Sequence, residues 1–504
     1  MPFTPPHVEL SAIAPEIALS VAALLLLVID AFVGERFHNW HLPILTTIGF
    51  IAAVYFALDG WDRAGEVQLA SMVVNDGFAN FVKLALCAFG VLTVWLAREY
   101  LTREGIEESE FYALVLFAVA GMMLMASASD LIVMFLALET FSLALYVLVG
   151  FRRRSLTSQE SALKYFLLGA FSSAFFLLGI ALAYGATGGT NFYPGAGSEA
   201  SLAGFLDSNP AGGVGLLVLA TGLLIIGLGF KIAAVPFHMW TPDAYQGAPS
   251  PVTGFMAAAT KIAGFAALLR LLDATLFPLR TDWKPLAIAI AVATMVIGSV
   301  VAVVQEDVKR MLAYSSIAHA GFVLIGVIAT NDRGVSGSLF YLATYGLTVL
   351  GAFAVIAAVA GRDERRVRLS QLKGLFYEQP LMSGALTLFL LSLAGVPITS
   401  GFVGKLVVFG AAIEGGYSWL VVIGVLASAV AAFFYLRVMV VMYMQEPDAP
   451  SADTAGVLAK GVVAVTAVAT IVFGLFWGPL IRAAEDATFF AERSATPPVQ
   501  TEGR

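Results

Sequence analysis

Cysteine is almost absent from this sequence, which has Cys87 alone among 504 residues. One thiol can form neither a disulfide framework nor the set of thiolates that holds an iron–sulfur cluster. Histidine is also scarce, and its positions are scattered: His7, His38, His41, His238 and His319. We therefore expect this chain itself to hold no metal and no redox cofactor.

Charged residues are also scarce. Charged residues make up 12% of the chain and hydrophobic residues 59%, whereas soluble domains carry about 25% charged residues. The net charge of −7 includes no basic excess of the kind that binds nucleic acid. The N-terminus lacks the basic segment of a cleaved signal, so the apolar run at 12–33 is expected to remain as a first helix. These features predict a polytopic membrane protein.

Apolar runs long enough to span a membrane recur along the chain, since about 20 residues suffice for one span. The sequence predicts an all-α protein of about 14 transmembrane helices, near residues 12–33, 39–59, 78–99, 111–128, 130–150, 161–186, 213–238, 250–275, 284–305, 308–330, 335–361, 380–414, 418–444 and 456–484. We expect residues 1–110 to hold helices 1–3, 111–275 to form one five-helix repeat, 284–444 a second repeat, 456–484 the last span and 485–504 a tail.

The basic residues predict the orientation. One set of alternate loops, with residues such as Arg98, Arg152 and Lys309, holds about twice as many lysines and arginines as the other set. Basic loops stay in the cytoplasm. With an even number of spans, both termini are then expected on the outer side.

An internal repeat relates two helix sets. Residues 130–150 open with Asp130 and end in Tyr-Val-Leu-Val-Gly, and residues 307–326 open with Asp307 and end in Phe-Val-Leu-Ile-Gly. Each set continues to a helix broken at proline or glycine, near Pro236 in the first and Pro397 in the second. The sets are five helices apart, which inverts the second across the membrane. Matched broken helices in inverted repeats indicate an ion site at mid-depth.

Lysines accompany these breaks. Lys231 lies five residues before Pro236, Lys261 lies eleven residues after Ser250, and Lys405 lies eight residues after Pro397. A charge at the membrane centre costs about 3 kcal/mol or more, so such residues usually face the bundle interior and have a function. Burial without a counter-charge disfavours a charged ammonium and allows it to release its proton. Snorkelling of each lysine to the interface is the alternative.

Glu139 is the expected partner of Lys231. It lies nine residues after Asp130, or about 13 Å along the helix and near the membrane centre. At a distance of about 4 Å its carboxylate would favour the charged lysine by roughly 4 kcal/mol. A carboxylate with a purely structural role is the alternative.

Three further residues are weaker candidates for proton transfer. His238 and His319 have the ordinary titration range of a relay group, although a structural role is equally compatible with their positions. Lys164 is either a pathway residue or an interface anchor. Asp243, Glu306 and Asp307 lie at expected helix ends, where capping is the default interpretation.

These acidic and basic groups run through both repeats. No nucleophile–base constellation, phosphate loop or metal-ligand spacing accompanies them. The pattern indicates a path for protons rather than a site of covalent chemistry.

The chain resembles the antiporter-like membrane subunits of proton-pumping NADH:quinone oxidoreductase, which are related to cation/proton antiporter subunits. The most specific part runs from Lys231 through His-Met-Trp-Thr-Pro-Asp-Ala-Tyr-Gln-Gly-Ala-Pro at 238–249 to Lys261. The segments Leu-Glu-Thr at 138–140 and Ser-Ser-Ile-Ala-His-Ala-Gly at 315–321 support it. The resemblance implies two inverted five-helix bundles, a charge pair of Glu139 and Lys231, a central relay at Lys261 and a distal proton site at Lys405.

The resemblance also implies the setting. The chain would lie in the bacterial plasma membrane among other membrane-arm subunits and lipids, with NADH, FMN, iron–sulfur clusters and quinone bound in partner subunits. Lys405, in place of the glutamate of one sister subunit, and the short segment after the last span favour the branch called subunit N. A membrane subunit of a sodium/proton antiporter, or of a related membrane-bound hydrogenase or dehydrogenase, is the alternative. An inactive scaffold is a further one.

Overall fold

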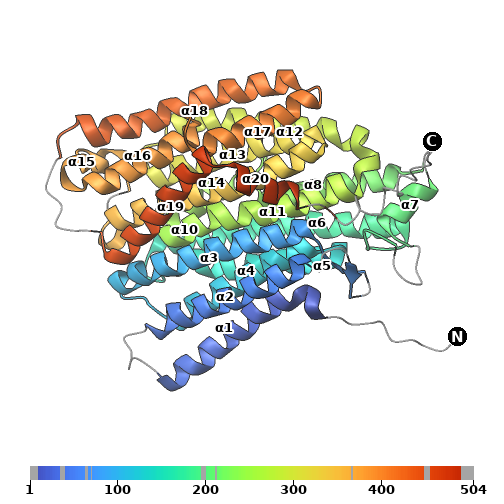
Figure 1. Ribbon diagram of the computed structural model, residues 1–504, viewed down its shortest axis with the longest axis horizontal. Coiled ribbons are helices and arrows are strands. Elements are labelled where there is room, and N and C mark those ends of the chain that lie inside the picture. The colour runs from blue at the N-terminus through green and yellow to red at the C-terminus, as the bar shows by residue number, and fades with distance from the viewer. Residues whose placement is uncertain are drawn as a thin grey trace, which may run out of the picture.

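Long apolar helices form nearly all of the computed structural model of this chain (Figure 1). The structure describes residues 10–33, 40–62, 66–69, 71–194, 200–209, 213–364, 367–447, 455–487 and 489. Most of the predicted tail over 485–504 lies outside these residues. So do several of the basic residues on which the predicted orientation rests.

Twelve helices in the described residues are long and apolar enough to cross a membrane. They are α1 (Ala14–Val33), α2 (His41–Asp62), α3 (Gly77–Glu104), α4 (Ser109–Ser127), α5 (Leu131–Val149), α6 (Leu156–Thr187), α12 (Arg280–Val303), α13 (Val308–Ala329), α14 (Asp332–Val359), α18 (Ser418–Met444), α19 (Val457–Leu475) and a composite helix from Ser250 to Thr275. Two shorter apolar helices, α8 (Gly215–Lys231) and α16 (Pro380–Ala394), complete the set. All fourteen overlap predicted spans, so the predicted all-α membrane fold is confirmed.

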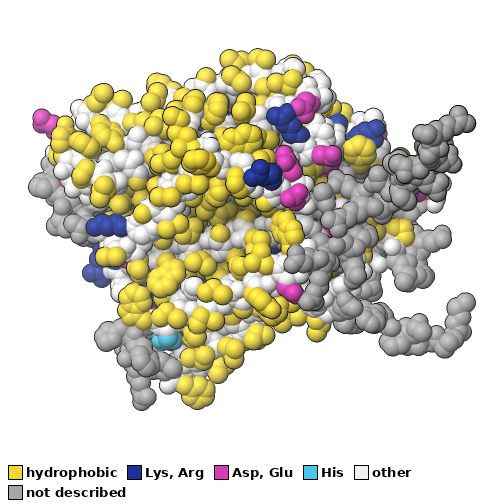
Figure 2. Space-filling model, in the orientation of Figure 1, with side chains coloured by type: hydrophobic (Ala, Val, Ile, Leu, Met, Phe, Trp, Pro, Cys, Tyr) yellow, Lys and Arg dark blue, Asp and Glu magenta, His cyan; other side chains and the backbone are white. Residues whose placement is uncertain are grey.

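The outer surface is apolar. Hydrophobic side chains cover most of the face in Figure 2, and the charged ones are few. In Figure 1 the blue helices α1 to α3 lie along one edge of the bundle and α18 lies along the opposite edge. Large exposed residues such as Phe171 and Phe433, 65% and 59% exposed, lie on long helices. An apolar surface of this extent fits contact with lipid or with neighbouring membrane subunits.

The two predicted breaks are present, but they differ from the sequence prediction in position. The run predicted as one helix over 213–238 ends at Lys231, and the chain continues through turns to α9 (Trp240–Gly247). The helix stops five residues before Pro236. A helix continued to Pro236 would lack the hydrogen bond to the carbonyl of Ile232, and the proline ring would clash with that carbonyl. The run predicted over 380–414 divides into α16 and α17 (Ser400–Glu414).

Both breaks hold a non-glycine residue in the left-handed region. Ala233 has φ 60° in the first break, and Ile398 has φ 80° in the second. Gly395, with φ 90°, ends α16, and its N–H donates to the carbonyls of Leu391 and Ser392. Left-handed backbone at residues with a Cβ costs about 1–3 kcal/mol and clusters at functional sites. Neither left-handed residue was predicted from the sequence.

The composite helix from Ser250 to Thr275 also departs from regular geometry. It consists of α10 (Ser250–Phe255), the π-helical segment η3 (Met256–Thr260), α11 (Lys261–Leu269) and a second π-helical segment, η4 (Arg270–Thr275). π-helical turns are rare and occur frequently at functional sites. Lys261 directly follows the first of these segments, and Arg270 opens the second.

The remaining elements are short. A two-stranded antiparallel sheet of β1 (Glu66–Gln68) and β2 (Val73–Asn75) joins α2 to α3, where the sequence predicted only a loop. The last predicted span, 456–484, is wrong as a single helix, because α19 ends at Leu475 and α20 (Gly478–Glu485) begins with a proline at its second residue. The other short elements are η1 (Leu10–Ile13), α7 (Leu202–Ser208), η5 (Phe277–Leu279), η6 (Arg362–Glu364), η7 (Leu369–Leu372) and α15 (Leu375–Glu378).

The broken helix of each predicted set packs against the long helix that precedes it in the chain. In the first predicted set α6 packs on α8 and α9, and in the second set α14 packs on α16 and α17. The composite helix is buried except at Asp273 and Ala274, which are partly exposed, and it contacts α14, α3 and α4. Each broken helix is therefore held against an unbroken one, and the interior between them contains the candidate site.

Candidate functional site

Lys231 ends α8 inside a cage of aromatic rings. Its side chain is buried, and its Nζ lies 3.5 Å from the hydroxyl of Tyr146. The ammonium is also 5.4–5.5 Å from the ring centroids of Phe141, Tyr146, Tyr165 and Phe230. Ring faces attract a cation. The rings therefore stabilise the ammonium form of a lysine whose side chain is buried.

Glu139 does not contact Lys231 directly. The half-buried carboxylate accepts a hydrogen bond from Ser173 of α6, and no ion pair joins it to Lys231 within the described residues. The expected separation of about 4 Å is therefore wrong for this structure. Tyr146, two turns further along α5, is the residue that touches Lys231.

Lys261 connects the first break to the second helix set. The buried Nζ donates to the carbonyl of Ile232, at 2.7 Å, and to that of Ser316 in α13, at 2.9 Å. Ile232 is the first residue after α8, where the end of the helix leaves carbonyls without a helical partner. The π-helical turn before Lys261 changes the register of its side chain on the composite helix. One lysine thus bridges a broken helix and an unbroken one.

Lys405 makes the corresponding contact at the second break. From α17 its buried Nζ donates to the carbonyls of Leu393 and Ala394, the last residues of α16, at 3.0 and 2.9 Å. A third bond, of 2.7 Å, goes to the hydroxyl of Ser428 in α18. The ring of Phe322 lies 5.0 Å from the ammonium. Lys405 therefore satisfies the end of α16 as Lys261 satisfies the end of α8.

His319 lies between these two lysines in a hydrogen-bonded group. Its Nδ1 is 2.7 Å from the hydroxyl of Tyr341, and its Nε2 is 3.3 Å from that of Tyr435. Tyr435 in turn shares a hydrogen bond with Ser315. His319 also lies one turn after Ser316, whose carbonyl accepts from Lys261, and it lines a pocket with Leu393, whose carbonyl accepts from Lys405. Of the two histidine candidates, this one lies in the interior.

A small pocket adjoins this group. About 10 Å³ of it is open to the centre of a water molecule, which is close to the space that one water needs. The hydroxyls of Tyr345, Ser400 and Ser316 lie buried nearby without a hydrogen-bond partner among the described residues. The pocket lining is His319, Tyr341, Thr344, Tyr345, Thr348, Ser392, Leu393 and Gly401. The hydroxyl of Tyr345 in the lining would be a partner for one such water.

The other predicted candidates lie apart from this interior. Lys164 is about half exposed and pairs with Glu160 at 2.7 Å and Asp243 at 3.0 Å. Asp243 also pairs with Arg310, so the capping role expected for Asp243 is wrong, whereas Asp307 does cap α13 through the N–H of Arg310. Glu306 is exposed and has no side-chain bond among the described residues.

His238 lies in the first break and is partly exposed. Its Nδ1 is buried without a hydrogen-bond partner among the described residues. The structure therefore brings Lys231, Lys261, His319 and Lys405 into the interior, keeps Glu139 beside them, and leaves Lys164 and His238 nearer the surface.

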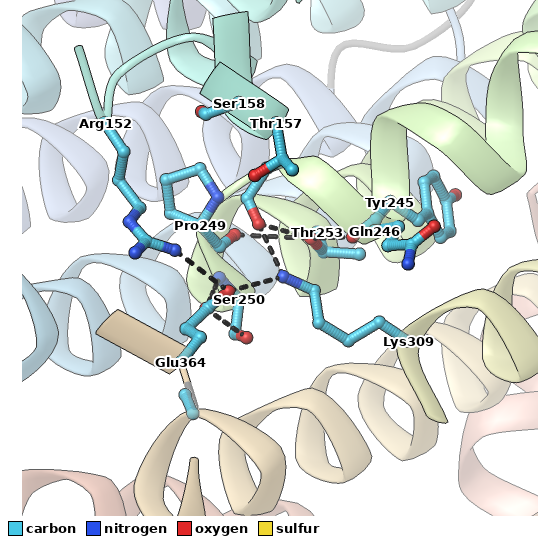
Figure 3. Close-up of polar contacts among 12 residues, drawn as sticks. Arg152, Thr157, Ser158, Tyr245, Gln246, Pro249, Ser250, Thr253, Lys309 and Glu364 are labelled. Atoms are coloured by element: carbon cyan, nitrogen blue, oxygen red, sulfur yellow. Dashed lines mark hydrogen bonds and ion pairs between the residues drawn. The ribbon is translucent and has the colours of Figure 1, made fainter. Parts of the chain in front are cut away.

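Sequence reasoning missed a buried ion cluster at the end of the bundle that carries the basic loops. Glu364 of η6 accepts from Lys309 at 2.8 Å and from the N–H and hydroxyl of Ser250 at 2.7 and 2.5 Å. Arg152 lies 3.4 Å away, and Lys309 also donates to the carbonyl of Ala248 at 2.6 Å. Figure 3 shows these side chains converging from the α5–α6 loop, α13 and η6 on the start of α10. The cluster joins both helix sets.

Nothing in the sequence separated Glu364 from its charged neighbours in one loop, and Lys309 and Arg152 entered the sequence analysis only as basic residues of the loops expected in the cytoplasm. Glu364 also has φ 50°, a conformation that the surrounding contacts must stabilise. Burial by itself raises the pKa of the Glu364 carboxyl, but Lys309, Ser250 and Arg152 together lower it more, so the pKa lies below its ordinary value. The carboxylate is therefore charged at neutral pH.

The Glu364→Gln variant is expected to be less stable than the natural protein at neutral pH, by about 1.5–3 kcal/mol, the usual range for a hydrogen bond to a charged group. Because the folded pKa of Glu364 is lowered, its stabilisation is complete above the ordinary glutamate pKa of about 4.3 and disappears as the pH falls through the folded value. Denaturant unfolding of the purified chain in detergent should show the two proteins converging in acid. The exposed Glu306→Gln is the control, and a difference that persists in acid would contradict the assignment.

Two further buried ion pairs were not predicted. Arg270, at the start of η4, makes two bonds of 2.8 and 2.9 Å to the carboxylate of Asp76, which caps α3. Lys83 of α3 pairs with Glu16 of α1 at 2.8 Å. Arg270, Lys83 and Glu16 lie within apolar runs, and hydropathy identifies these runs only as membrane spans. The two ion pairs stabilise the packing of the first helices against the interior.

The interior holds the buried amines of Lys231, Lys261 and Lys405. The part of the chain that the structure describes contains no group of three or more His, Cys, Asp and Glu residues that could hold a metal ion. The three interior lysines hydrogen bond to carbonyls and hydroxyls and have no carboxylate within ion-pair distance among the described residues. Such amines can take up and release protons in place.

Comparison with known proteins gives consistent results. A family model described as NADH:quinone oxidoreductase/Mrp antiporter, TM, matches residues 128–431. Subunit N of NADH-quinone oxidoreductase from Parafrankia sp. (strain EAN1pec) is 43% identical over 511 residues, covering 96% of this chain and 96% of that protein. A chain of respiratory complex I from Thermus thermophilus is 34% identical, with a TM-score of 0.77 and coverage of 94% of this chain and 100% of that one. A chain of the Mrp complex from Dietzia sp. DQ12-45-1b, 23% identical with a TM-score of 0.81, covers 94% and 96% and shows a shared fold.

Proposed function

The chain belongs to the NADH:quinone oxidoreductase/Mrp antiporter family of membrane proteins, and from that premise we propose that it is a proton-translocating membrane-arm subunit of NADH-quinone oxidoreductase. Its likeness to relatives called subunit N covers nearly the whole chain. Because the complex I chain is more similar in sequence than the Mrp chain, the respiratory complex is favoured over a sodium/proton antiporter. The branch favoured by Lys405 agrees with these relatives.

One observation carries the proposal. Lys231, Lys261 and Lys405 are all buried, and two of them bond to the carbonyl ends of broken helices. A charge at mid-membrane is costly, so three such lysines in one interior are retained for a function. His319 lies one turn after Ser316, whose carbonyl accepts from Lys261, and it lines a pocket with Leu393, whose carbonyl accepts from Lys405. We assign the sequence Lys231, Lys261, His319, Lys405 as the proton path.

Glu139 would act as the control point of this path. It lies two turns before Tyr146 on α5, and the Tyr146 hydroxyl lies 3.5 Å from the Lys231 ammonium. A shift of Glu139 away from Lys231 would release the proton toward Lys261. Each proton moved outward works against about 2.3 kcal/mol per 100 mV of membrane potential, so redox energy from the rest of the complex has to drive that shift.

The setting follows from the same premise. The chain is a multi-pass bacterial membrane protein and part of a multi-subunit membrane arm. NADH, FMN, iron–sulfur clusters and quinone would be bound by partner subunits. We retain 111–275 and 284–444 as the two functional units, with both termini on the outer side. These assignments place the Glu364 cluster at the cytoplasmic end.

The test is made on purified complex reconstituted into vesicles, with NADH-driven quinone reduction and proton uptake recorded together. We expect Lys231→Ala and Glu139→Ala to lower the number of protons moved per NADH. Lys164→Ala, a half-exposed lysine in the same helix set, is the matched control and should pump normally. Natural proton stoichiometry in both variants, with the chain present in normal amount, would contradict the proposed path. Failure to copurify with any NADH-oxidising partner would favour the antiporter.

A further inference from the structure

An open pocket lies at the end of the bundle that carries the basic loops, outside the proton path. Its volume is about 740 Å³, within the range of about 300–1,000 Å³ for small-molecule sites. Three segments enclose it: the α3–α4 loop, the α5–α6 loop and the start of η6. The lining residues are Glu104, Gly105, Ile106, Glu108, Phe151, Arg152, Arg153, Arg154, Ser155 and Arg362.

Positive charge dominates this pocket. Four arginines line it against two glutamates. One of these glutamates, Glu104, faces Arg103 outside the lining, at 3.8 Å. Arg152 is held from beneath by the buried Glu364, as Figure 3 shows. The exposed Arg153, Arg154 and Arg362 have no carboxylate partner within the described residues.

The pocket continues into an apolar stripe. Ser155 lines the pocket, and the next residue, Leu156, begins α6 and is 80% exposed. Leu163, Leu167 and Phe171 follow on the same helix, each more than half exposed. Their spacing of seven, four and four residues places all of them on one helix face. The stripe extends for about 22 Å, comparable with the depth of one membrane leaflet.

We propose that this pocket binds the phosphate group of an anionic phospholipid, with the acyl chains along the α6 stripe. Planar guanidinium groups bind phosphate with two parallel hydrogen bonds. Basic pockets at the cytoplasmic ends of membrane helices suit anionic lipid head groups. A free phosphate would use the same arginines, but it would leave the exposed apolar stripe without a partner. The combination of charge and stripe therefore favours the lipid.

The test uses the whole purified complex in vesicles that contain photoreactive phosphatidylglycerol, compared with photoreactive phosphatidylcholine. We expect labelling by phosphatidylglycerol to map to the α5–α6 loop and the start of α6. In the double variant Arg153→Gln/Arg154→Gln the affinity should fall roughly thirtyfold, since each basic side chain near anionic lipid is worth about 1 kcal/mol. Arg368→Gln, an exposed arginine beyond the pocket, is the matched control and should label normally.

The competing outcomes are distinct. If sn-glycerol 3-phosphate, which has no acyl chains, abolishes labelling as completely as unlabelled phosphatidylglycerol does, the ligand is a soluble phosphate and the lipid assignment fails. Equal labelling by phosphatidylcholine, or undiminished labelling of the double variant, also overturns it. So does cross-linking of this pocket to an acidic segment of a neighbouring subunit without any lipid label. The variants are expected to assemble, because both arginines are exposed. Native gels check this.

Discussion

Replacing Arg270 with methionine is expected to destabilise the folded chain by about 3–5 kcal/mol, the cost of leaving one member of a buried ion pair without its partner. The Asp76 carboxylate would remain buried among apolar residues, and its two bonds to the guanidinium would be lost. The same change also removes the bond of 2.9 Å from Nε to the carbonyl of Ala126, at the end of α4. The start of η4 would then no longer be bonded to the N-cap of α3 or to the end of α4.

The rings beside the guanidinium increase the effect. Arg270 lies 5.1 Å from the ring centroid of Phe78 and 5.7 Å from that of Phe489. A cation over an aromatic face contributes about 2 kcal/mol where water is excluded. Methionine keeps some packing with these rings but none of the electrostatic attraction. A stability loss of this size should lower the amount of chain found in membranes.

The measurement is the denaturant midpoint of the purified chain in detergent, together with its abundance in the assembled complex. Arg280→Met, an exposed arginine on α12, is the control and should change stability by about 1 kcal/mol or less. The double variant Arg270→Met/Asp76→Asn should be less destabilised than the sum of the single variants, because no unpaired charge remains. Additive losses would show that the two residues act independently.

Replacing Lys261 with methionine is expected to slow proton transfer through this chain about a hundredfold. The proton would have to cross the interior without a carrier, at a cost of about 3 kcal/mol or more, and each 1.36 kcal/mol is a factor of ten. Lys405→Met should have a similar effect, because His319 would then have no acceptor on its outer side. Both variants keep the volume and the apolar stem of the side chain.

Proton uptake per NADH oxidised, measured in vesicles, tests this expectation, with Lys460→Met as the control because Lys460 is exposed at the start of α19. Methionine also leaves the carbonyls of Ile232 and Ser316 without their donor, so assembly has to be checked on native gels. A normal proton ratio in an assembled Lys261→Met complex would exclude Lys261 from the path.

The sequence predicted the spans because length and hydropathy decide what a membrane helix is. It also predicted both breaks, since Pro236, Gly395 and Pro397 interrupt helices for simple steric reasons. The observed breaks begin earlier than these prolines, because α8 ends at Lys231 and α16 ends at Ala394. Lys231, Lys261 and Lys405 could be selected because a lysine in an apolar run is conspicuous whatever the fold.

Contacts between distant residues could not be predicted in this way. Tyr146, rather than Glu139, reaches Lys231, and that depends on the rotation of α5 relative to α8. Arg270 was hidden near the end of a predicted span, where a basic residue usually reaches the surface. Glu364 lies in a short charged loop, and only the folded chain brings Lys309 and Arg152 to it. The π-helical turn before Lys261 has no signature in residue type.

The three hydrogen bonds of Lys405 have a further consequence. An ammonium has three N–H donors, and here they match three acceptors, two of them carbonyls at the end of α16. A neutral amine has two donors and a lone pair. The Ser428 hydroxyl, which donates to the carbonyl of Ala394 at 3.2 Å, would then turn to donate to that lone pair, and the carbonyl would lose its bond from Ser428. We expect infrared difference spectra of Lys405-dependent turnover to show an amide carbonyl that loses and regains a hydrogen bond. The end of α16 would then lose and regain one hydrogen bond for every proton transferred.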